Sequence, residues 1–97
     1  MSEKREMDDK LKKIANYYGL EAQLCQLMEE CCELAVECNH AIRKRVLEKL
    51  VEELADVEIM LEQIKYLCDC SKEMKEIKNY KIDRQIERIE QEEKNNG

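Results

Sequence analysis

Apolar residues recur at intervals of three and four along most of the chain, which is the spacing of amphipathic helices. In the first segment, residues 3–18, these positions are Met7, Leu11, Ile14 and Tyr18. Gly19 follows directly, where the left-handed backbone conformation beyond a helix end favours glycine. The pattern therefore predicts a first helix over residues 3–18.

Two further helices are predicted on either side of a polar and basic connection. The second helix covers about residues 20–39, with an apolar stripe made of Leu24, Leu27, Met28, Cys31, Leu34, Ala35 and Cys38. The sequence "NHAIRKR" then mixes polar and basic residues, and we interpret part of it as the connection. The third helix covers about residues 45–68, with apolar positions Leu47, Leu50, Val51, Leu54, Val57, Leu61, Ile64 and Cys68.

A fourth helix follows, and either Asp69 or Ser71 is a suitable residue for its N-terminal cap. Its apolar positions are Met74, Ile77, Ile82, Ile86 and Ile89. We expect residues 93–97 to form a frayed tail, which leaves residues 1–92 as a single domain. The 97-residue chain contains no proline and only two glycines, and it lacks alternating strand-like runs. The sequence therefore predicts an all-α fold.

Charge and composition exclude several classes of partner. The net charge of −6 disfavours nucleic acid, which needs a basic surface. No apolar run approaches the roughly 20 residues that span a membrane, and "MSEKREMDDK" has no apolar signal segment. We therefore expect a cytoplasmic protein without a membrane partner. The six cysteines include no CxxC pair and His40 is the one histidine, so reduced thiols packed as small apolar residues are favoured over disulfides or zinc.

Two pairs of acidic residues interrupt apolar segments at a spacing of three. Glu30 and Glu33 lie in "LMEECCELAVECNH", and Glu53 and Asp56 lie in "LVEELADVEIM". Residues three apart on a helix project in nearly the same direction. If the second and third helices pack antiparallel, the two pairs can meet, and four close carboxylates would either raise one another's pKa or hold a cation. Mg²⁺ and Mn²⁺ are the hard ions that prefer such oxygen ligands.

These two acidic motifs, in this order, resemble the motifs of a known family. "EECCE" at Glu29–Glu33, followed by "EELAD" at Glu52–Asp56, resembles the EExxE…ExxD signature of the MazG-like all-α nucleoside triphosphate pyrophosphohydrolases, over roughly residues 20–90. The resemblance implies a four-helix MazG-like bundle completed by homo-oligomerisation. It also implies hydrolysis of nucleoside triphosphates, with dNTPs or non-standard NTPs as expected substrates, between the α and β phosphates to monophosphate and pyrophosphate.

The resemblance also assigns roles to individual residues. It implies that Glu30, Glu33, Glu53 and Asp56 bind Mg²⁺, for which Mn²⁺ is a possible substitute. Glu29 would support these ligands or act as a base for the attacking water, so Glu29 and Glu30 are the catalytic candidates.

A basic stripe on the predicted fourth helix is a candidate for phosphate contacts. Lys81, Arg84 and Arg88 share one face, and the family carries basic residues in a similar late region. The alternative is a set of surface ion pairs with neighbouring glutamates. Because a chain of this size buries only a small core, we expect a homodimer or homotetramer, as the resemblance also implies.

Two other functions are compatible with the sequence. One is a non-catalytic helical regulator that binds nucleotides or proteins. The other is a metal or redox sensor built on Cys31, Cys32 and Cys38.

Overall fold

Over residues 2–97, the chain forms four helices joined by very short connections. The structure, a computed structural model, describes residues 2–97. The helices are α1 Ser2–Tyr18, α2 Leu20–Lys44, α3 Glu48–Cys68 and α4 Ser71–Asn96. The described residues contain no strand, which confirms the all-α prediction.

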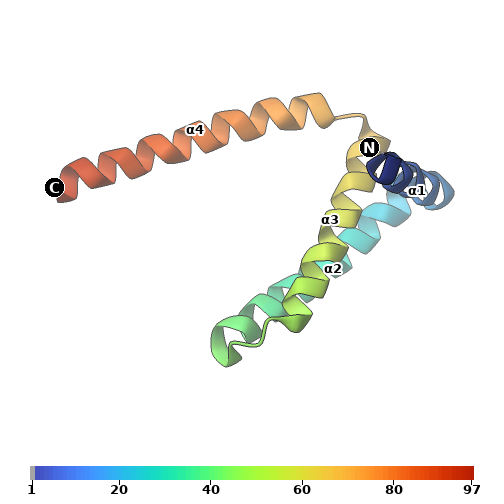
Figure 1. The fold of residues 1–97 in the computed structure, drawn as a ribbon, viewed down its shortest axis with the longest axis horizontal. Coiled ribbons are helices and arrows are strands. Elements are labelled where there is room, and N and C mark those ends of the chain that lie inside the picture. Colours follow the sequence, from blue (N-terminus) through green and yellow to red (C-terminus); the bar gives the residue numbers. More distant parts are fainter. Residues whose placement is uncertain (1) are drawn as a thin grey trace.

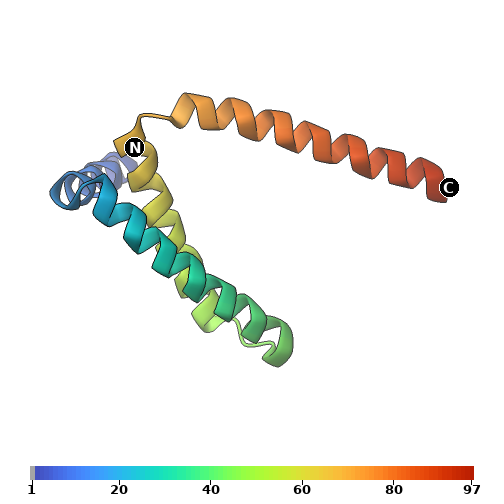
Figure 2. The ribbon, with the colours of Figure 1, turned by 180° about the vertical axis from the view of Figure 1, so that it is seen from behind.

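Helices α2 and α3 lie side by side and antiparallel, and α1 packs across the end where α2 begins and α3 ends (Figures 1 and 2). Helix α4 leaves the end of α3 and projects away from the other three helices. Within one chain, therefore, three helices pack together and α4 stands apart from them.

The helix ends differ from the prediction in four places. Helix α2 continues to Lys44, because "NHAIRK" contains no glycine or proline, and Arg45 ends it in the left-handed conformation with φ 55°. The third helix accordingly starts at Glu48 and not at residue 45.

At the start of α4, neither predicted cap is correct. Asp69 instead closes α3 in the left-handed conformation, with φ 50°, and its N–H donates to the carbonyls of Lys65 and Tyr66. Cys70 takes the cap position of α4, and Ser71 is already helical. The helix then continues through Asn96, beyond residue 93 where a frayed tail was expected.

Helix α2 packs on α3 along one edge of its predicted apolar stripe. At about 100° per residue, its buried and half-buried positions form one line, which consists of Gln23, Leu27, Glu30, Leu34, Glu37, His40 and Ala41. Leu27 and Leu34 belong to the predicted stripe, whereas its other five positions lie about a quarter turn away and are exposed: Leu24, Met28, Cys31, Ala35 and Cys38. The acidic edge of the helix therefore faces α3, with leucines on either side of Glu30.

Helix α3 shows the same displacement. Val57 and Met60 are buried against the other helices, whereas Val51, Leu54 and Leu61 are exposed. Because α2 and α3 run antiparallel and both exposed stripes are displaced in the same sense, the two stripes fall on the same side of the helix pair. We call this surface the bare apolar face; its members are Leu24, Met28, Cys31, Ala35, Cys38, Val51, Leu54 and Leu61.

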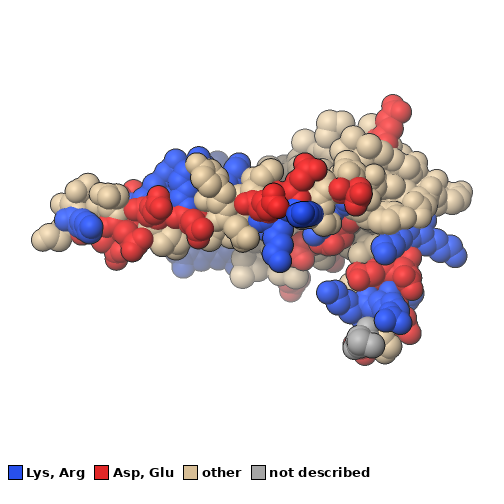
Figure 3. Space-filling model, turned by 90° about the horizontal axis from the view of Figure 1, so that it is seen from above, with Lys and Arg blue, Asp and Glu red and all other residues tan. Residues whose placement is uncertain are grey.

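The isolated chain is more open than a compact domain of its size. Its radius of gyration is 17.3 Å, whereas a compact 100-residue domain has a value of about 13 Å. Its accessible surface is 8474 Å², against roughly 5,800 Å² expected for a compact protein of this mass. Helix α4 has no buried residue and carries charged side chains of both signs along its length (Figure 3). Much of the excess surface is therefore on α4 and on the bare apolar face.

Candidate metal centre

Three of the four predicted ligands converge between α2 and α3. One carboxylate oxygen each from Glu30, Glu33 and Glu53 lie within 4.8 Å of one another. Within residues 2–97, this acidic trio is the one group of three or more metal-ligating side chains brought so close together. The antiparallel packing of the two helices thus brings together residues that are 20 or more positions apart in the sequence.

Two oxygens of the trio are buried without a partner. Glu30 Oε2 and Glu53 Oε2 have no hydrogen-bond partner among the described residues. The other oxygen of Glu30, Oε1, accepts a hydrogen bond of 2.9 Å from Gln26 Nε2. An ionised carboxylate can only accept, so unpaired buried oxygens at this spacing are costly unless a proton or a cation satisfies them. The donor set therefore fits a hard divalent cation.

The pKa of Glu53 reports the same crowding. Burial raises the pKa of its carboxyl from 4.5 to about 7, assisted by Glu30, which can accept a hydrogen bond from the protonated form of Glu53, and by the negative charges of Glu33, Glu30 and Asp56. Glu53 is only half-buried, so the neighbouring carboxylates contribute alongside desolvation. In the metal-free chain, Glu53 is consequently the carboxyl that takes up the proton.

We expect the free energy of unfolding of the metal-free protein to fall as the pH rises from 4.5 to about 7. In this window the folded chain retains a proton on Glu53 that the unfolded chain has released, so a higher pH favours unfolding. The stabilising contribution is fully present below 4.5 and is lost above about 7. Thermal melts in EDTA across this range measure it, with Glu53→Gln as the reference. A difference in melting temperature between the wild type and Glu53→Gln that stays constant with pH would contradict the raised pKa of Glu53.

The remaining acidic candidates lie beside the trio. Asp56 is exposed one turn after Glu53, outside the trio itself, and its charge acts on Glu53. Glu29 is exposed on α2, next to Glu30. Both are within one helical turn of a trio member, so the structure keeps all the predicted acids in one region without placing all four in mutual contact.

The predicted phosphate contacts lie far from the trio in the same chain. Glu53 is close to the start of α3, about 22 Å of helix from Cys68, and α4 then projects away from that end (Figure 1). Lys81, Arg84 and Arg88 are all exposed on α4, and the Arg84 guanidinium lies 5.6 Å from the centre of the Tyr80 ring. One chain therefore does not bring its basic stripe to its own carboxylates.

The cysteines do not form a site. All six are free thiols, and five of them are exposed: Cys25, Cys31, Cys32, Cys38 and Cys68. The prediction that they pack as small core residues is therefore wrong for the single chain. His40 lies inside α2, where its Nδ1 is 3.2 Å from Glu37 Oε1, away from any cluster of thiols.

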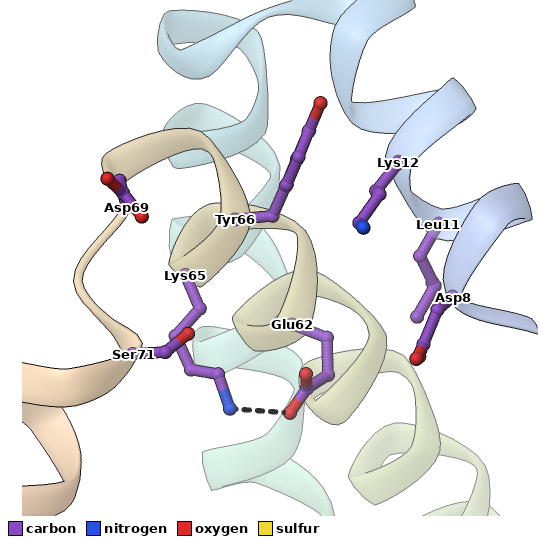
Figure 4. Close-up of a pocket in the computed structure, with 8 residues that line it drawn as sticks. All are labelled: Asp8, Leu11, Lys12, Glu62, Lys65, Tyr66, Asp69 and Ser71. Atoms are coloured by element: carbon purple, nitrogen blue, oxygen red, sulfur yellow. Dashed lines mark hydrogen bonds and ion pairs between the residues drawn. The ribbon is translucent and has the colours of Figure 1, made fainter. Parts of the chain in front are cut away.

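A separate polar cavity of about 290 Å³ lies where α1, the end of α3 and the start of α4 meet (Figure 4). Lys65 Nζ and Glu62 Oε1 form an ion pair of 2.9 Å there, and Lys12 Nζ lies 5.6 Å from the centre of the Tyr66 ring. The Tyr66 hydroxyl accepts a hydrogen bond from Asn16 Nδ2 at 2.9 Å. These contacts join α1 to α3, and the cavity contains none of the predicted site residues.

Sequence reasoning missed three glutamines on the helices that carry the trio, α2 and α3. Gln23 and Gln63 are buried, and Gln26 binds Glu30. A signal was present, because Gln23 is seven residues before Glu30 and Gln63 is seven after Asp56, so each shares a helix face with a motif acid.

No family model, curated protein or solved structure matches this chain. The resemblance to the MazG-like family consequently depends on the motif residues and on where the fold places them. Among the helices described over residues 2–97, none has an apolar stretch long enough to cross a membrane.

Proposed function

We propose that the protein is a cytoplasmic, Mg²⁺-dependent nucleoside triphosphate pyrophosphohydrolase, which releases pyrophosphate and leaves a nucleoside monophosphate. The observation that supports this most directly is the acidic trio, with two buried oxygens that have no partner in the chain. The order of the EECCE and EELAD segments is the second support.

In this proposal, Glu30, Glu33 and Glu53 hold the cation, and Asp56 completes the set from one turn along α3. When bound, the cation would neutralise charge on the phosphates and polarise the α-phosphate for attack. Gln26 orients Glu30 through its hydrogen bond, which fixes one ligand before the cation arrives. Glu29, exposed beside this set, is positioned to accept the proton of an attacking water.

We also propose that the working protein is an oligomer, at least a dimer. The bare apolar face and α4 leave apolar surface exposed, and permanent interfaces bury about 2,000–5,000 Å² of surface of this kind. The excess of accessible surface over a compact monomer is about 2,700 Å² for each chain, so two chains together have enough to form an interface at the upper end of that range. A second copy would also allow Lys81, Arg84 and Arg88 to approach carboxylates that they do not reach in their own chain.

The expected result of the first test is that the protein releases pyrophosphate and monophosphate from some nucleoside triphosphates with Mg²⁺ or Mn²⁺, and none with EDTA. A panel of ribo- and deoxyribonucleoside triphosphates, assayed for both products, makes the measurement. Release of orthophosphate instead would point to cleavage at another bond. No product from any triphosphate would leave a nucleotide-binding or protein-binding regulator as the better account.

A further inference from the structure

The line along which α2 and α3 pack, which we call the seam, continues beyond the acidic trio to the short connection between the two helices. At about 100° per residue, His40 and Lys44 fall on the same side of α2 as Glu33. They lie about 10 and 16 Å further along the helix axis. This end of the helix pair lies away from α1 and α4 (Figure 1). The seam therefore changes from acidic to basic within one chain, without the stripe on α4.

Helix α3 contributes a third basic residue, Lys49, to the same end of the seam. Lys49 precedes Glu53 by four residues, so it shares the face of Glu53 and lies about 6 Å closer to the connection. Helical side chains lean toward the N-terminus of their own helix. Because the helices run antiparallel, Lys49 leans toward the connection, whereas His40 and Lys44 lean toward the trio. The three basic side chains therefore converge over the turn of α2 that carries Glu37.

Glu37 and His40 form a hydrogen-bonded pair in this turn, with His40 Nδ1 3.2 Å from Glu37 Oε1. An ionised carboxylate can only accept, so Nδ1 donates and Nε2 is the ring nitrogen left for a ligand. The Glu37 side chain is 17% exposed and that of His40 is 43% exposed. The carboxylate is thus mostly covered and fixes the orientation of a ring that solvent can reach. Among residues 2–97, neither Lys44 nor Lys49 forms an ion pair.

The two ends of the seam differ in polarity, and this difference sets a direction for a charged ligand. Toward α1, the seam contains the buried, neutral side chains of Gln23 and Gln63. Burying a charge there without a partner of opposite sign would be costly. The chain as a whole has a net charge of −6, so a triphosphate needs a local reversal of sign. The connection end of the seam supplies that reversal next to the trio.

We infer that this end of the seam binds the pyrophosphate part of the substrate, its β and γ phosphates, through His40, Lys44 and Lys49. The inference rests on the proposed function, since it requires the α-phosphate to lie at the trio. The trio can bind phosphate only through a cation, whereas these three side chains offer N–H donors and positive charge directly to the oxygens. They would also stabilise the negative charge that develops on the departing pyrophosphate. Glu37 is a positioning residue that holds the His40 ring.

The test measures binding of inorganic pyrophosphate to the full-length chain in Mg²⁺ by isothermal titration calorimetry. Pyrophosphate is the proposed leaving group, and its binding requires no turnover. We expect Lys44→Gln, Lys49→Gln and His40→Ala each to weaken binding about tenfold, the size of one charge-assisted hydrogen bond. Thermal melts confirm that each variant folds, and His40→Gln replaces His40→Ala if the latter does not.

The variant Arg43→Gln is the matched control. Arg43 is exposed next to Lys44, so its substitution removes the same charge from the same helix end, but its side chain projects roughly a quarter turn away. At an ionic strength of about 0.15 M, charges that make no contact with the ligand are largely screened. Pyrophosphate binding by Arg43→Gln should therefore stay close to that of the wild type.

A second variant separates the positioning role of Glu37 from its charge. Glu37→Met removes a negative charge from beside the phosphates, which by electrostatics alone would tighten pyrophosphate binding. We expect weaker binding instead, because the His40 ring loses its acceptor. The same substitution in the His40→Ala background should cause no further loss, since the two residues act as one unit. Tighter binding by Glu37→Met would overturn the positioning role.

The outcomes separate this inference from the proposed function. Unchanged pyrophosphate binding in Lys44→Gln and Lys49→Gln would overturn the inference, and so would an equal loss in Arg43→Gln. If such a protein still hydrolysed triphosphates, the proposed function would stand. Pyrophosphate binding that depends on Lys44 and Lys49, without hydrolysis of any triphosphate, would support the inference and count against the proposed function. Neither binding nor hydrolysis would overturn both.

Discussion

Replacing Glu53 by glutamine is expected to lower metal-dependent pyrophosphate release by more than about 100-fold. Even the loss of a residue that only supports a metal ligand lowers metal affinity or activity by about 10–100-fold. Glu53 is the α3 member of the trio, and its Oε2 is one of the two buried oxygens without a partner. An amide keeps the shape of the side chain but supplies no negative charge to the cation. Steady-state assays with Mg²⁺ at a saturating triphosphate concentration measure the loss.

The same substitution is expected to raise the melting temperature of the metal-free protein at pH 8. Above a pKa of about 7, Glu53 carries a charge that Glu33, Glu30 and Asp56 all oppose. Removing it relieves the repulsion, so stability and activity move in opposite directions. A variant that lost activity through misfolding would instead melt earlier.

Two comparisons make the result specific. Asp56→Asn is expected to reduce release to a similar extent, because the ExxD half of the motif places that carboxylate one turn from Glu53. Glu87→Gln, an exposed change on α4 with the same chemistry, should leave both activity and melting temperature unchanged. Normal turnover in both Glu53→Gln and Asp56→Asn would exclude the trio as the active site.

Mixing two inactive variants is expected to restore activity, and this is the second large effect. The double variant Arg84→Ala, Arg88→Ala lacks the basic stripe, and Glu53→Gln lacks the metal ligand. Removing a group that stabilises the charge of the transition state lowers kcat by about 10²–10³-fold. Each variant alone should therefore be nearly inactive. If the stripe acts on the carboxylates of a second copy, a mixed dimer contains one site that is complete.

In a twofold dimer with random exchange, half of the dimers are mixed and one of their two sites is intact, so about a quarter of the wild-type activity should return. Denaturing the two variants together and refolding them ensures exchange. A mixture with the neutral double change Gln85→Ala, Gln91→Ala on the same helix, in place of the arginine variant, controls for effects of α4 itself. Sedimentation of the wild-type chain at micromolar concentration should give a dimer or larger species.

Three outcomes would contradict this prediction, each for a different reason. Full activity of the arginine variant would show that Arg84 and Arg88 are surface residues only. Two inactive variants that do not complement each other would show that each chain completes its own site, which requires α4 to fold back from its position in Figure 1. A monomer in sedimentation would exclude the oligomer altogether.

The sequence by itself determined the all-α class and the approximate extent of each helix. These properties depend on local spacing and on the lack of helix breakers, which neighbours in the chain decide. The helix ends were harder to predict from the sequence. Arg45 and Asp69 adopt positive φ without being glycine, so no residue type signalled those two ends.

The acidic motifs were also visible in the sequence, because residues three apart on a helix must share a face. The meeting of Glu30, Glu33 and Glu53 needed the antiparallel packing of α2 and α3, and the tertiary structure supplied it. The packed face was predicted only in part. Leu27 and Leu34 of the predicted stripe are half-buried, but Leu24 and Met28 are exposed, and the line through Gln23 and Glu30 completes the face toward α3.

Only the tertiary structure decided what surrounds the carboxylates and where α4 lies. The raised pKa of Glu53 and the unpaired oxygens of Gln23, Glu30 and Glu53 come from groups distant in sequence, so no local pattern encodes them. The isoleucines of α4 have the same spacing as those of a packed helix, yet the helix buries none of them within its own chain. Periodicity specifies that a helix has an apolar side, whereas long-range packing determines which surface, in this chain or another, covers it.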